Sequence, residues 1–178
     1  MNTAFLKLGG SLLVATTILC GCGPSAKQLA EQEAIQKSRQ NFREAVAAVK
    51  VCTQGSTYQE FHEKKFTLET TYTANQSILA GESKEIEHLI SIMEATDILW
   101  TLGNQIKIQF THFHPDESKK PEWAHAMLII KNGENDGTTW EQMKAEHDFP
   151  DNYVRRGLTL ISKQCDELLA RDFSLAAH

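Results

Sequence analysis

SKEIEHLISIMEATDILW, residues 83–100, is the stretch that decides the fold. Its apolar residues return three, four and seven positions apart, while Glu85, Glu87 and Glu94 fall elsewhere. That spacing is typical of a helix with one buried side. It predicts a long helix that begins near Ser83, with its buried positions at Ile86, Leu89, Ile90, Met93 and Trp100.

Helical periodicity is also present before this stretch. Apolar residues return every seven positions between Lys27 and Cys52, and Gly55 then supplies a stop. Thr57 and Glu60 have the spacing of a capping box, so we expect a second helix to begin there and to end at Gly81. The predicted buried positions are Ile35, Phe42, Ala45, Val46, Val49 and Cys52 in the first helix, and Phe61, Leu68, Tyr72 and Leu79 in the second.

A last long helix is predicted from Asp151. Gly157 interrupts it, at a cost of about 1 kcal/mol relative to Ala. Its predicted buried positions are Val154, Leu158, Ile161, Cys165, Leu168 and Leu169.

The region between the third and the last helix is irregular. Residues 105–113 alternate like a strand, or they continue the third helix up to Pro115, which is the interpretation we favour. Short helices are expected from Pro121 to Ile130, and after a Thr138-x-x-Glu141 cap up to about Glu146.

Together these elements predict an all-α fold. We expect an antiparallel helical bundle of about four long helices, with an irregular insertion carrying short helices between the third and the fourth. A single helical domain would then occupy residues 27–174.

The start of the chain has a different character. Met1 to Leu8 carries one cation, Lys7, and no acid, and residues 8–19 are apolar or small throughout. Such a run is too short to cross a bilayer, which takes about 20 residues. A secretory signal over residues 1–21 is therefore predicted.

Leu19-Cys20-Gly21-Cys22 resembles the lipobox of bacterial lipoproteins. Leu19 matches its aliphatic position, Gly21 its small position and Cys22 the lipid acceptor, whereas Cys20 stands where Ala, Ser or Thr is commoner. The resemblance implies cleavage before Cys22 and an anchor of acyl chains, such as palmitate, on that residue. Secretion with an ordinary cut nearby is the alternative.

Residues 22–26 would form the lipidated N-terminus and a short tether, since two or three acyl chains hold a protein firmly to a membrane. Gly23 rather than Asp follows the lipid acceptor. In Gram-negative lipoproteins this resembles an outer-membrane address, which places the mature domain in the periplasm.

Charge narrows the class of partner. Loss of the signal removes Lys7 and no acid, so the formal net charge changes from −5 to about −6. A mildly acidic chain without a basic patch argues against nucleic acid as a partner. The partners that we expect are the membrane, through the N-terminal lipid, and another envelope protein.

Two thiols remain in the mature domain, Cys52 and Cys165. Exported proteins enter an oxidising compartment in which two free cysteines usually pair, so we expect a disulfide that joins the first helix to the last. Two separate buried thiols are the alternative.

Aromatic residues gather in the irregular region, at Trp123, Trp140, Phe149 and Tyr153. They would line a ligand pocket or a partner-binding patch, or else form a small core that holds the insertion in place.

The same region holds four side chains able to bind a metal: His112, His114, Asp116 and His125. They match no recognised zinc spacing, so a polar loop is the alternative. Asp97 falls on or beside the apolar side of the third helix. If buried, it would need a cation, which Arg155 or Arg156 would supply.

No motif for catalysis or cofactor binding is present: Gly-x-Ser-x-Gly, a phosphate loop and Cys-x-x-Cys are all missing. The sequence thus predicts a non-catalytic interaction or scaffold domain without a cofactor. The alternative is a periplasmic lipoprotein that binds a ligand or a metal through residues 110–153.

Overall fold

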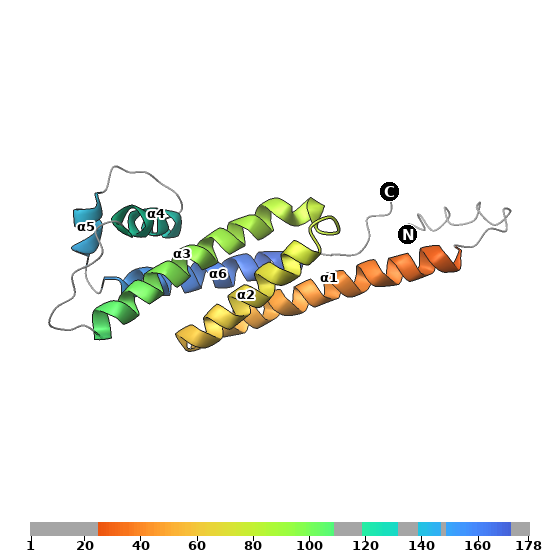
Figure 1. Ribbon diagram of the computed structural model, residues 1–178, viewed down its shortest axis with the longest axis horizontal. Coiled ribbons are helices and arrows are strands. Elements are labelled where there is room, and N and C mark those ends of the chain that lie inside the picture. The colour runs from red at the N-terminus through yellow and green to blue at the C-terminus, as the bar shows by residue number, and fades with distance from the viewer. Residues whose placement is uncertain (1–24, 109–118, 132–138, 147–148, 172–178) are drawn as a thin grey trace, which may run out of the picture. The chain divides into compact units, whose positions relative to one another are not determined.

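The computed structural model describes residues 25–108, 119–131, 139–146 and 149–171 (Figure 1). Every regular element in these ranges is helical, which confirms the all-α class. The elements are α1 (Ala26–Cys52), α2 (Tyr58–Ala74), the 3-10 turn η1 (Ala80–Glu82), α3 (Ser83–Ile108), α4 (Lys120–Ile130), α5 (Trp140–Lys144) and α6 (Asp151–Ala170).

The chain divides into two units, Met1–Ala34 and Ile35–His178. In the first unit every described residue, from Ser25 to Ala34, is exposed to solvent. Residues 27–34 therefore add no buried side chain to the domain predicted over 27–174. The buried core belongs to the second unit.

Local signals set most of the helix boundaries. The predicted capping box at Thr57 is confirmed, since its side chain accepts from the Glu60 amide and Glu60 accepts from the Thr57 amide. Pro121 lies in the first turn of α4, as expected. Residues 105–108 are helical, and the rest of the ambiguous stretch, from 109, lies outside the described residues.

Two predicted boundaries are wrong. The second helix ends at Ala74 rather than at Gly81, because the side chain of Asn75 turns back and donates to the Thr71 carbonyl at 2.7 Å. The cap of α5 is Thr139, which accepts from the Gln142 amide at 3.3 Å. The predicted Thr138 and Glu141 pair is thus displaced by one residue.

Side-chain contacts show that α2 runs antiparallel to α3, and α1 to α6. Between α2 and α3, Tyr58 reaches Thr101 at 3.0 Å and Tyr72 donates to Glu87 at 3.0 Å. Residue numbers rise along one helix as they fall along the other. Between α1 and α6, Arg43 donates to the Leu169 carbonyl at 3.1 Å and Lys50 pairs with Asp166.

Helix α3 packs against α2, α4 and α6 (Figure 1). Ile86, Leu89 and Met93 are fully buried as predicted, whereas Ile90 and Trp100 are half-buried. Because α3 has neighbours on several sides, its buried positions extend well beyond one stripe and also include Ile92, Ala95, Thr96, Leu99 and Leu102.

Helix α6 approaches α3 closely at Gly157. A Cβ atom there would lie 2.2 Å from Thr96 Oγ1 and 3.0 Å from Ile130 Cδ1. Thr96 is completely buried, and its hydroxyl donates to the Ile92 carbonyl of its own helix at 2.8 Å. Because Gly157 has no side chain, there is room at this point for α3, α4 and α6 to meet.

Within the ranges described, none of the helices combines the length and the apolar character needed to cross a bilayer.

Gly157→Ala should lower the free energy of unfolding by about 1 to 3 kcal/mol, because the added methyl group overpacks the contact with Thr96. This loss would appear although Ala is the better helix former by about 1 kcal/mol. Urea denaturation followed by circular dichroism measures it.

Gly81→Ala is the matched control, since a Cβ there meets nothing within 4 Å. It should change stability by less than about 0.5 kcal/mol. Gly157→Ala should also cost less when Thr96 is replaced by Ala. Equal effects at positions 81 and 157 would contradict the steric role of Gly157.

Candidate functional site

A groove of about 880 Å³ opens where the α1–α2 turn, the C-terminal part of α3 and the start of α6 meet. Its volume lies within the range of roughly 300–1,000 Å³ that is common for small-molecule sites. The apolar lining consists of Trp100, Ile106, Phe149, Pro150, Val154 and Leu158, and the polar lining of Thr53, Gln54, Ser56, Asp151 and Arg155.

The polar wall of the groove is the turn between α1 and α2, which Gly55 completes with a φ of 135°. The Thr53 hydroxyl donates to the Lys50 carbonyl at 2.7 Å, and the Ser56 hydroxyl donates to the Cys52 carbonyl at 2.8 Å. Both hydroxyl protons thus satisfy the last carbonyls of α1. Toward the groove, these two oxygens can only accept hydrogen bonds.

Aromatic contacts hold the apolar walls in place. The Trp100 ring lies 5.6 Å from Phe61 and 5.9 Å from Tyr58, both on α2. The Phe149 ring lies 6.3 Å from Tyr153 in an edge-on arrangement. Aromatic pairs at these distances attract each other, so the walls keep their shape without a ligand.

Gly103 on α3 allows the start of α6 to lie close to α3 beside the groove. A Cβ at Gly103 would lie 3.2 Å from Pro150 Cγ and 3.3 Å from Asp151 Oδ1. The Asp151 carboxylate is therefore held on the α3 side of the groove.

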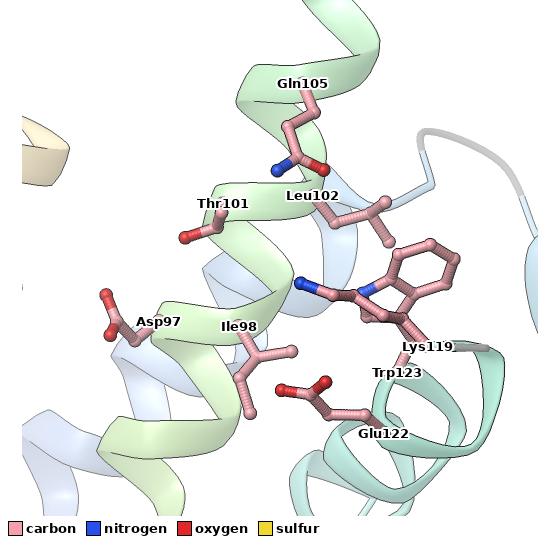
Figure 2. A pocket seen from close by; sticks show the side chains of 8 residues that line it. All are labelled: Asp97, Ile98, Thr101, Leu102, Gln105, Lys119, Glu122 and Trp123. Atoms are coloured by element: carbon pink, nitrogen blue, oxygen red, sulfur yellow. The ribbon is translucent and has the colours of Figure 1, made fainter. Parts of the chain in front are cut away.

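A smaller pocket of about 170 Å³ lies between α3 and α4. Figure 2 shows Lys119, Glu122 and Trp123 facing α3 from the α4 side, with Asp97 and Thr101 on α3 itself. Its volume is below the roughly 300 Å³ at which typical ligand sites begin. The groove is therefore the stronger candidate for a binding site.

Asp97 is nearly buried, with 14% of its side chain exposed. Its two oxygens lie 3.1 and 3.2 Å from His62 Nδ1, and one of them lies 3.4 Å from Lys65 Nζ. The described partners of Asp97 therefore come from α2, and the prediction that Arg155 or Arg156 on α6 would pair with it is wrong.

The Lys65 ammonium is held in its charged form. Burial alone would lower the pKa of Lys65, but the carboxylates of Glu69 and Asp97 outweigh burial and raise that pKa above its ordinary value. The cluster of His62, Lys65 and Asp97 thus acts as a charged link between α2 and α3.

The four predicted aromatic residues do not share one surface. Tyr153 is fully buried and Trp123 is 4% exposed, so both belong to the core. Phe149 lines the groove. Trp140 is the first residue of α5, and its side chain lies outside the described residues.

Tyr153 joins the segment after α5 to the core. Its hydroxyl donates to Glu146 at 2.6 Å, and Lys131 pairs with the same carboxylate at 3.3 Å. Burial raises the pKa of Glu146, but these two partners outweigh it and leave the pKa below its ordinary value. The Glu146 carboxylate therefore stays charged and holds the ends of α4 and α6 together.

Most of the predicted metal ligands lie outside the residues that the structure describes. His112, His114 and Asp116 lie outside the described residues, as does the lipid acceptor Cys22. His125 is exposed on α4. Over the described ranges, no three His, Cys, Asp or Glu side chains are placed to hold a metal ion.

Cys52 and Cys165 are both free thiols, and both are buried. The ion pair between Lys50 and Asp166 shows that they lie at similar levels of two adjacent helices. Burial raises the pKa of the Cys165 thiol to about 12. A disulfide between the two residues stays a prediction.

After reduction, Cys165 should react with iodoacetamide far more slowly than an exposed thiol, because burial raises its pKa to about 12 and leaves little thiolate. Peptide mass spectrometry measures labelling between pH 7 and 9. Val51→Cys gives the control, since Val51 is 68% exposed. Equal rates at the two positions would refute the burial of Cys165. A cross-linked peptide that joins Cys52 to Cys165 in the unreduced digest, and that disappears on reduction, would establish the disulfide.

Asp97→Asn should destabilise the protein by about 1 to 2 kcal/mol, since it removes the acceptor charge from Lys65 and His62. The loss should shrink when Lys65 is already Gln, because the two positions share one interaction. Lys64→Gln, at an exposed neighbouring position, is the control. Additive losses at 65 and 97, measured by urea denaturation, would contradict the link.

No protein-family model matches this chain, and neither a curated protein nor a solved structure shows significant similarity to it.

Proposed function

We propose that the chain is the precursor of a bacterial lipoprotein, cut before Cys22 and tethered through acyl chains on that residue. The observation that carries this proposal is the sequence Leu19-Cys20-Gly21-Cys22 after a short apolar run. The anchored domain faces the periplasm from the outer membrane in a Gram-negative cell, with Gly23 after the acceptor as the supporting residue.

The mature domain acts without catalysis, as an interaction or scaffold domain that contacts another envelope protein. Three observations support this. No catalytic motif is present in the sequence, the charge is mixed and mildly acidic, and the described charged clusters link helices to one another. These links stabilise the packing of the helices, and the outer helix surfaces remain available for contacts with a partner.

The domain from Ile35 onward is an antiparallel bundle built on α1, α2, α3 and α6, with α4 and α5 as the insertion. Antiparallel contacts between α2 and α3, and between α1 and α6, support this arrangement. Short connections, such as the turn that contains Gly55, also favour antiparallel neighbours.

The anchor is tested on the full chain expressed in a Gram-negative host. Mass spectrometry of the membrane-extracted protein should find an N-terminal Cys22 that carries diacylglycerol. Cys22→Ser should abolish processing and leave an uncut precursor.

Cys20→Ser is the matched control, because it alters the tolerant position and should leave processing and lipidation intact. A bare N-terminus, or a Cys22→Ser chain that is still cut and membrane-held, would overturn the proposal.

A further inference from the structure

The groove offers two kinds of surface to a ligand. Trp100 and Phe149 line it with aromatic rings that are each half-buried, so part of each ring remains accessible. Thr53 and Ser56 line it from the α1–α2 turn. Apolar rings combined with a few fixed polar groups are typical of small-molecule sites.

The two hydroxyl groups of the turn accept hydrogen bonds from the groove but do not donate into it. The Lys50 carbonyl accepts from both the amide and the hydroxyl of Thr53, at 3.1 and 2.7 Å. The Cys52 carbonyl accepts from both the amide and the hydroxyl of Ser56, at 3.3 and 2.8 Å. Each hydroxyl has one proton, so its oxygen is left as an acceptor. The C-terminal end of a helix is also the negative end of its dipole, so this wall favours a hydrogen-bond donor over an anion.

The charged residues of the groove do not call for a charged ligand. Asp151 and Arg155 are the charged members of the described lining, and both already interact with other residues. A ligand that brought its own charge into the groove would lose hydration without gaining a free partner. A neutral ligand therefore fits the groove best.

We propose that the groove binds a neutral aromatic small molecule that carries a hydroxyl or N–H donor, such as a phenol or an indole with two or more rings. Its rings lie against Trp100 and Phe149, and its donor binds the hydroxyl oxygen of Thr53 or Ser56. The volume of about 880 Å³ leaves room for more than one ring. This binding goes beyond the proposed scaffold role and does not depend on the lipid at Cys22.

The test uses the full chain, in phosphatidylcholine vesicles if it is membrane-held and in buffer if it is not. Three aryl diazirines are compared that differ only in the para substituent, which is a hydroxyl, a methoxy group or a carboxylate. After irradiation, mass spectrometry locates the labelled peptides, and each signal is normalised to labelling elsewhere on the chain. The hydroxyl compound should label residues 53–56, 100–106 and 149–158 about five-fold more than the other two compounds, a factor that one hydrogen bond explains.

Removal of the two acceptors tests the polar wall. Thr53→Val with Ser56→Ala should reduce the preference for the hydroxyl compound over the methoxy compound to below about two-fold, since neither compound then finds a hydroxyl acceptor. The Lys50 and Cys52 carbonyls keep their amide donors, so the turn should persist.

The matched control is Thr70→Val with Thr73→Val. These two hydroxyls also donate to carbonyls of their own helix, each at 2.8 Å, but they lie exposed on α2 outside the groove, so the preference should remain. Phe149→Leu should lower labelling by the hydroxyl and methoxy compounds alike, whereas Phe66→Leu, at an exposed position of α2, should not. Circular dichroism melting checks that each variant is folded.

Competition distinguishes a small molecule from a side chain of a partner protein. Hydroxybiphenyl should displace the label about ten-fold better than N-acetyltyrosinamide, because its second ring buries more apolar surface. Equal displacement would assign the groove to a tyrosine of a partner and would overturn the proposal.

Three other results would also overturn it: a preference for the carboxylate, equal labelling by the hydroxyl and methoxy compounds in the unaltered protein, or an unchanged preference in the Thr53 and Ser56 double variant. The comparison of the three compounds needs no variant, so it decides the matter even if a substitution prevents folding. The anchor is judged separately by the mass of the N-terminus, so either proposal can fail without the other.

Discussion

The missing side chain at Gly157 is the constraint on which the packing of this protein depends. It lets α6 come so close to α3 that Thr96 occupies the place of a Cβ, and Ile130 of α4 closes the same point. Gly103 has a related role on α3, where Pro150 and Asp151 approach it at the start of α6. The groove lies beside these contacts and takes Gly103 into its own lining. The groove and the core are thus shaped by the same close approaches.

Charged groups add orientation at the edges of this core. His62 and Lys65 reach Asp97 across α2 and α3, and Lys50 meets Asp166 across α1 and α6. An exposed pair such as Lys50 and Asp166 contributes about 0 to 1 kcal/mol, so hydrophobic burial remains the main stabilising term. These pairs also set the orientation of the helices, because a carboxylate that is bound by side chains from one particular helix disfavours other arrangements.

Local features were predictable from the sequence, and distant ones were not. The helix around Ile86, the capping box at Thr57 and the start of α6 depend on spacings of a few residues, and all were found. The partners of Asp97 lie 35 residues before it in the case of His62, a separation that no local pattern reveals. The groove was missed for the same reason, since its walls come from three separate segments and only Phe149 among the four predicted aromatic site residues lines it. Aromatic content alone left a surface patch and a small core open for Tyr153, and its fully buried ring with a satisfied hydroxyl makes it a core residue.

Gly157 also determines the position of α6 along its own axis. The Thr96 hydroxyl donates its proton to its own helix, so the contact between Thr96 and Gly157 favours one alignment through steric fit rather than through a hydrogen bond from that hydroxyl. A slide of α6 by one turn, about 5.4 Å, would place Tyr153 or Ile161 opposite Thr96, where a bulky side chain has no room. Because Gly157 has no side chain, α6 fits against α3 in one register only. The periodicity of the sequence alone does not select that register.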